Sequence, residues 1–218
     1  MKLSNLPKML SVLRRECRQW KQPIVGTFAA GENALFKILV STLLSLRTQD
    51  KTTEAASHRL FRRTQAPETL LKLSEKQIEG LIYPVGFYRT KAKNLRRVCQ
   101  ILMDQYGGNV PETMEELLEL PGVGRKTANL VMTVGHNKPG ICVDTHVHRI
   151  SNRWGLVKTK TPDETEMALR EILPKRYWIE FNDLLVCYGQ NLCQPVSPRC
   201  SVCKIRPYCP RIGVTKYR

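Results

Sequence analysis

The chain has 218 residues and carries 35 Lys and Arg against 19 Asp and Glu, a net charge of +16. This length suffices for one large or two small domains with a hydrophobic core. The positive excess favours a polyanionic partner, most often nucleic acid, although a merely basic protein would have the same charge. No apolar run is long enough to span a membrane, and the N-terminus lacks the apolar core of a signal peptide. We therefore expect a protein of the reducing cytosol with no membrane partner.

Helical patterns follow one another along the chain, and strand signals are few and short. Near the N-terminus, apolar residues recur at steps of three and four, which predicts an amphipathic helix. Residues 33–46 are apolar almost all round, as in a central buried helix. A capping-box pattern at 74–77 begins a later helix, and residues 90–106 form a basic amphipathic helix that two glycines stop. The predicted fold class is all-α.

The stretch LPGVGRKTA, residues 120–128, is typical of a tight hairpin between two helices. Gly122 and Gly124 remove side chains where a turn needs unusual dihedral angles or close backbone approach. The second helix then begins with unpaired backbone N–H groups, which suit a phosphate. Arg125 and Lys126 stand at the same helix end, where cations oppose the helix dipole. Such a broken local rule marks a place to look for function.

Four cysteines near the C-terminus have the spacing C-x6-C-x2-C-x5-C: Cys193, Cys200, Cys203 and Cys209. Four thiolates this close can bind one zinc ion or an iron–sulfur cluster, and the spacing alone leaves both open. The other four cysteines lie in apolar surroundings, and we interpret them as core residues: Cys17, Cys99, Cys142 and Cys187.

Three motifs together resemble the endonuclease III family of helix-hairpin-helix DNA glycosylases: LPGVGRKTA, VDTHVHR at 143–149, and the cysteine tail. The resemblance extends through LLSLRTQD, VGFYRTKAKN and GGNVPETMEELLELPGVG, so it covers most of the chain. It implies two α-helical domains with DNA bound in a cleft between them. One is a six-helix barrel over 28–138; the other joins 1–27 to 139–218 and carries a [4Fe–4S] cluster on the four cysteines.

The resemblance also implies a bifunctional enzyme, which excises an oxidised pyrimidine such as thymine glycol and then cleaves the strand at the abasic site. Lys126 would be the nucleophile, forming a Schiff base before β-elimination, and Asp144 the carboxylate that stabilises a cationic sugar. The helix N-terminus and Arg125 both disfavour the ammonium form of Lys126, whereas Asp144 is placed to cap a helix whose dipole keeps it ionised. Taken singly, Lys126 is more readily interpreted as a phosphate contact and Asp144 as a helix cap, and it is their combination in the family's motifs that indicates catalysis.

Further expected DNA contacts follow the family's loops. Arg47 and Phe87 match two positions that fill the gap left by the flipped base, where many members have glutamine and leucine. This departure leaves open which lesions the protein prefers and which base it prefers opposite the lesion. Phe87 could instead pack on the barrel. Arg199 is the one basic residue in a loop that contacts phosphate in the family. His146 either contacts DNA or is a neutral structural imidazole.

The hairpin residues Gly122, Gly124 and Arg125 are expected to approach a DNA phosphate through backbone and charge. The basic helix adds five cations, which we expect to contact phosphate or face solvent: Arg89, Lys91, Lys93, Arg96 and Arg97.

The expected partner is double-stranded DNA with damaged bases or abasic sites, bound by a monomer in a bacterial or archaeal cytosol, near the nucleoid. An adenine-excising relative lacks the lysine at position 126, so that alternative is rejected. A mismatch uracil or thymine glycosylase, or a non-catalytic iron–sulfur DNA-binding module, stays open. The presence of both Lys126 and Asp144 argues against the module.

Overall fold

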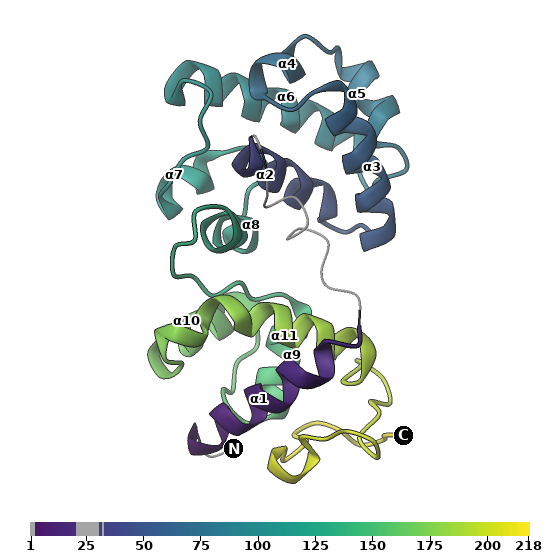
Figure 1. Ribbon diagram of the computed structural model, residues 1–218, viewed down its shortest axis with the longest axis vertical. Helices are drawn as coiled ribbons and strands as arrows, with labels where there is room; N and C mark the ends of the chain where they lie inside the picture. The colour runs from purple at the N-terminus through teal and green to yellow at the C-terminus, as the bar shows by residue number, and fades with distance from the viewer. Residues whose placement is uncertain (1–2, 21–30, 32) are drawn as a thin grey trace. The chain divides into compact units, whose positions relative to one another are not determined.

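The computed structural model describes residues 3–20, 31 and 33–218, and every regular element in these ranges is helical (Figure 1). The all-α prediction is confirmed. The chain divides into a terminal unit, Met1–Pro23 with Ile141–Arg218, and a central unit, Ile24–Gly140. The expected domain boundary between residues 27 and 28 lies outside the described residues.

None of the described helices is both long and apolar enough to cross a membrane.

The central unit is built around α2 (Ala34–Ser45), which packs against four other helical elements of the unit. Leu39, Val40 and Leu44 on this helix are fully buried, as the all-apolar pattern predicts. The remaining elements of the unit are α3 (Asp50–Arg63), α4 (Pro67–Leu71), α5 (Glu75–Ile82), α6 (Tyr88–Tyr106), α7 (Met114–Glu119), α8 (Arg125–Leu130) and a π-helical segment η3 (Val131–Gly135).

Local sequence signals set several helix ends in this unit. Ser74 Oγ accepts a hydrogen bond of 3.2 Å from the backbone N–H of Gln77, whose side chain accepts one of 2.8 Å from Ser74 N–H. This reciprocal pair confirms the predicted capping box at the start of α5. Helix α6 ends at Tyr106, and its C-cap Gly107 has a φ of 57° in the left-handed region that favours glycine.

The terminal unit brings the two ends of the chain together. Helix α1 (Leu6–Cys17) packs on α11 (Trp178–Asn191), and Figure 1 shows this purple helix beside the green helices of the C-terminal part. The apolar face of α1 supplies the contact, since Leu6, Leu10 and Leu13 are buried. The other elements are η1 (Leu3–Asn5), α9 (Thr145–Arg153), α10 (Pro162–Ile172), η4 (Lys175–Tyr177) and η5 (Arg206–Tyr208).

The four cysteines interpreted as core residues are all buried, which confirms that interpretation: Cys17, Cys99, Cys142 and Cys187.

Candidate active site

The two hairpin glycines differ in backbone conformation and in their surroundings. Gly122 has a φ of +83°, and a Cβ there would lie 2.9 Å from Nδ2 of Asn94, so any side chain at this position would be strained. Gly124 is the N-cap of α8 with an ordinary φ of −102°. A Cβ at Gly124 would meet nothing within 4 Å. Of the two predicted reasons, unusual dihedral angles or close backbone approach, the first holds at Gly122. At Gly124 the dihedral angles are ordinary, and the missing side chain leaves the helix start open.

Lys126 is the second residue of α8 and is exposed, while Arg125 before it is half-buried. The following residues Thr127, Ala128 and Asn129 are buried and anchor the helix on the core of the central unit. The helical path continues from α8 directly into η3. Lys126 is thus presented to solvent from an anchored backbone, as a nucleophile for a large substrate requires.

The structure brings Arg47 and Phe87 together. The Arg47 guanidinium lies 5.6 Å from the centroid of the Phe87 ring, and both residues line a hollow that also includes Gly122. Both have a positive φ, 52° for Arg47 and 57° for Phe87, which is uncommon outside glycine. Phe87 is 63% exposed, so packing on the barrel is excluded and its ring stays available for stacking.

The expectation that all five cations around α6 contact phosphate or face solvent is wrong for two of them. The Arg96 guanidinium donates to the backbone carbonyls of Leu71, at 3.0 Å, and Leu73. The Lys91 ammonium donates to backbone carbonyls at the end of α2. Both side chains donate hydrogen bonds to carbonyl groups that the ends of helices leave without intrahelical partners. The three exposed cations are Arg89, Lys93 and Arg97.

Asp144 caps α9, as the sequence predicts. Its Oδ1 accepts hydrogen bonds from the backbone N–H groups of His146 and Val147, at 2.8 and 2.9 Å. The hydrogen bonds of this carboxylate to described residues all use Oδ1. One oxygen therefore fixes the side chain on the helix start while Oδ2 is available for a substrate.

His146 is held inside the terminal unit. Its Nδ1 lies 3.0 Å from Nη2 of Arg149. A guanidinium only donates, so Nδ1 accepts and the ring proton sits on Nε2 of a neutral imidazole. A Cβ at Gly189 would lie 2.9 Å from Cβ and Cγ of His146, which shows how closely α11 approaches the ring. These contacts favour the structural imidazole over a DNA contact.

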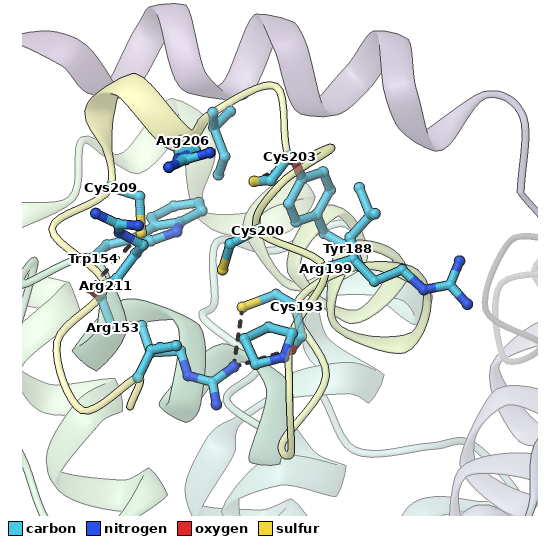
Figure 2. A pocket seen from close by; sticks show the side chains of 14 residues that line it. Arg153, Trp154, Tyr188, Cys193, Arg199, Cys200, Cys203, Arg206, Cys209 and Arg211 are labelled. Atoms are coloured by element: carbon cyan, nitrogen blue, oxygen red, sulfur yellow. Dashed lines mark hydrogen bonds between the residues drawn. The ribbon is translucent and has the colours of Figure 1, made fainter. Parts of the chain in front are cut away.

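The four tail cysteines line one pocket, and Figure 2 shows their sulfurs around a shared space. Within the described part of the chain, no three His, Cys, Asp or Glu side chains converge closely enough to hold a single metal ion. Four thiols that line one pocket are a donor set that either a zinc ion or an iron–sulfur cluster takes.

Cations and donors surround these sulfurs. Arg153 Nη1 lies 3.3 Å from Cys193 Sγ, and the Tyr188 hydroxyl lies 3.2 Å from Cys203 Sγ. Burial raises the pKa of the Cys209 thiol to about 11, so a thiolate there needs a bound cation beside it. The exposed side chain of Arg199 points away from the sulfurs in Figure 2, where it is accessible from solvent.

Sequence reasoning assigned no role of their own to Arg149 and Arg153, and it gave Lys91 a phosphate or solvent contact in place of its carbonyl partners. Arg149 ends the VDTHVHR motif three residues after His146, a spacing that places both on one helix face and could have linked them. Lys91 and Arg153 contact backbone carbonyls far along the chain, and no local pattern marks such partners.

Comparisons with known proteins agree with this geometry. A model of the HhH-GPD superfamily base excision DNA repair proteins matches residues 40–175. Endonuclease III of Thermotoga maritima is 49% identical over 174 residues, covering 80% of this chain and 82% of that protein. Endonuclease III-like protein 1 of Gallus gallus is 45% identical over 178 residues, covering 80% of this chain and 63% of that protein. Fold and site therefore define a base excision DNA repair protein of the HhH-GPD superfamily.

A solved structure of a trapped endonuclease III–DNA covalent intermediate has a TM-score of 0.86 and 31% identity, covering 97% of each chain. A thermostable thymine-DNA glycosylase, with a TM-score of 0.71 and 24% identity over 89% of this chain and 86% of its own, shares the fold. Within the superfamily, the chain belongs to the endonuclease III family. It is a bifunctional DNA glycosylase and AP lyase of base excision repair.

Proposed function

We propose that the enzyme removes oxidised pyrimidines, such as thymine glycol, from duplex DNA and cleaves the strand at the resulting abasic site. The observation that carries this proposal is the exposed Lys126 at the start of α8. It stands in a chain that matches, over 97% of its length, an endonuclease III captured as a covalent intermediate with DNA. The net charge of +16 supports a polyanionic substrate.

Lys126 is proposed as the nucleophile. The damaged base must first leave the stack so that its sugar carbon becomes accessible. The neutral amine of Lys126 then bonds to C1′ while the bond from C1′ to the base breaks and the base leaves with the electron pair and a proton. Opening of the sugar ring gives a Schiff base on Lys126 Nζ. Loss of a proton from C2′ then expels the 3′ phosphate, which breaks the strand.

Asp144 is proposed as the carboxylate that stabilises positive charge on the sugar and accepts a proton. Its capped position supports this role, because the bonds from His146 N–H and Val147 N–H hold the anion without using Oδ2.

We assign the grip on DNA to three sets of residues. Gly122, Gly124 and Arg125 present backbone N–H groups and charge to a phosphate. Arg47 hydrogen-bonds the orphaned base while Phe87 stacks in the gap. Arg199, exposed beside the cysteine pocket, contacts a further phosphate.

The four tail cysteines are proposed to hold a [4Fe–4S] cluster, and we place the enzyme in a reducing bacterial or archaeal cytosol, where the thiols stay reduced. The cluster would cross-link the segment after α11 at four points, which suits a chain region with little regular structure. The nearby Arg153 offsets the negative charge of four thiolates. Protein purified without oxygen should be brown and contain iron and acid-labile sulfide, whereas a colourless zinc protein would refute the cluster.

The central test is borohydride trapping on abasic duplex DNA. The wild type should form a covalent adduct that Lys126→Gln does not form, and Lys76→Gln on the exposed face of α5 should trap like the wild type. A Lys126→Gln protein that traps normally would end the assignment. A mismatch glycosylase would instead excise uracil or thymine and leave the strand uncut, and a non-catalytic module would leave both bonds intact.

A further inference from the structure

Lys91 is a cation of the central unit that the roles above do not use. Its Nζ lies 2.8 Å from the carbonyl oxygen of Leu44, 2.6 Å from that of Leu46 and 3.3 Å from Oγ1 of Thr48. An ammonium group has three N–H donors, so each donor has an acceptor. The carbonyls belong to the last turn of α2 and the residue after it, where a cation also complements the helix dipole.

Thr48 links the Lys91 contact to a second loop, the one that contains Gly86. Its Oγ1 donates to the Leu46 carbonyl at 3.2 Å and accepts from Lys91 and from the backbone N–H of Gly86, at 3.1 Å. A hydroxyl has one donor and two acceptor sites, and all three are occupied. The two loops also touch directly, because a Cβ at Gly86 would lie 2.6 Å from the carbonyl oxygen of Arg47.

The loops joined in this way carry Arg47 and Phe87. Both residues have left-handed backbone angles, which persist outside glycine only where the surroundings determine them strongly. Their side chains contact each other but contribute little to the core, since Phe87 is 63% exposed. The contacts that define the position of this pair therefore lie beneath it, at Lys91 and Thr48.

We propose that Lys91 is a positioning residue that holds the Arg47 and Phe87 loops in one arrangement, so that the pair enters the base stack as a preformed wedge. A wedge ordered before binding avoids the entropy cost of ordering two loops on DNA. Burial lowers the pKa of Lys91 to about 8, so the ammonium still predominates at neutral pH with its three acceptors. The inference rests on the proposed roles of Arg47 and Phe87.

The test compares two duplexes, one with thymine glycol opposite adenine and one with thymine glycol opposite an abasic spacer. The spacer duplex has no partner base to be held, so a wedge matters less there. Single-turnover nicking by Lys91→Met should fall at least tenfold on the paired duplex and less than threefold on the spacer duplex. Lys76→Met, which removes an exposed charge from α5, should match the wild type on both.

Thr48 supplies a second pair of variants that leaves Lys91 intact. Thr48→Val removes the bridging hydroxyl and should show the same selective loss of nicking on the paired duplex. Thr48→Ser keeps the hydroxyl and should nick the paired duplex like the wild type. A 2-aminopurine placed opposite a non-cleavable abasic analogue gives an independent reading. Its fluorescence change on binding should be large for the wild type and Thr48→Ser, and small for Lys91→Met and Thr48→Val.

Two results would overturn the inference: equal losses on both duplexes, which would make Lys91 a general structural residue, or wild-type behaviour of both Lys91→Met and Thr48→Val. A wild type that nicks neither duplex would instead refute the proposed substrate, so the two failures are distinguishable.

Discussion

Arg149 donates two hydrogen bonds to the carbonyl oxygen of Cys193, from Nε at 3.2 Å and from Nη2 at 2.8 Å. Arg149 lies on α9, the helix that Asp144 caps, and Cys193 is the first cysteine of the pocket. The same Nη2 reaches back to His146 in the first turn of the helix, at 3.0 Å. One half-buried side chain thus connects the helix carrying the proposed catalytic carboxylate to the proposed cluster segment.

Replacement of Arg149 by Met should loosen this connection. Burial lowers the pKa of Arg149, so its guanidinium charge needs the hydrogen-bond acceptors around it. In Arg149→Met, the carbonyl of Cys193 also loses its charged donor. We expect Arg149→Met to lower the free energy of unfolding by about 1.5–3 kcal/mol, the range for hydrogen bonds to charged groups. Urea denaturation measures this change. Arg97→Met on the exposed face of α6 is the control, and an unchanged midpoint for Arg149→Met would contradict the connection.

Asp144 has two separable roles, which two substitutions distinguish. Asp144→Asn keeps an Oδ1 that can accept the two N–H groups of the cap, but it removes the negative charge. It should unfold close to the wild-type midpoint, lose base excision and retain more cleavage at preformed abasic sites. Asp144→Ala removes the cap as well and should cost about 1 kcal/mol of stability. Normal thymine glycol excision by Asp144→Asn would exclude the carboxylate role.

Gly189 should be intolerant of any side chain. A Cβ there would press on the imidazole of His146, which Arg149 holds in place, so the two helices would have to separate. We expect Gly189→Ala to destabilise the protein by about 1–3 kcal/mol through overpacking. Gly80→Ala is a matched control, since its Cβ would meet nothing within 4 Å inside α5 and should stabilise by about 0.5–1 kcal/mol. Equal effects of the two changes in thermal melts would be inconsistent with this packing.

Asp183 on α11 makes stability depend on pH. Burial raises its pKa from the ordinary 3.8 to about 6. Between these values the folded state holds a proton that the unfolded state has lost, so the free energy of unfolding falls as pH rises through this window. A shift of roughly two pKa units corresponds to about 3 kcal/mol at most.

Asp183→Asn should therefore raise the free energy of unfolding at pH 7 by about 1–3 kcal/mol, and the gain should vanish below about pH 4. Urea denaturation across this pH range measures the difference. Asp163→Asn, on the exposed first turn of α10, removes the same charge and should give no gain. A stabilisation by Asp183→Asn that persists at low pH would have another cause.

Features that depend on neighbours along the chain could be predicted from residue types and their spacing. The capping box at Ser74, the glycine at position 122, the cap at Asp144 and the spacing of the cysteines all involve residues a few positions apart, so their side-chain types identify them. Family motifs place Lys126 by the same means. For this reason the all-α fold and the principal candidate residues could be predicted.

Which cations turn inward, and which groups they bind, depends on contacts between segments that are distant in the sequence. Lys91 reaches carbonyls at Leu44 and Leu46, and Arg149 reaches the carbonyl of Cys193, each more than forty residues away. Every residue has the same backbone carbonyl, so no side-chain pattern marks these acceptors in the sequence. The hollow formed by Arg47 and Phe87 has the same origin, because it exists only where the end of α2 and the start of α6 meet.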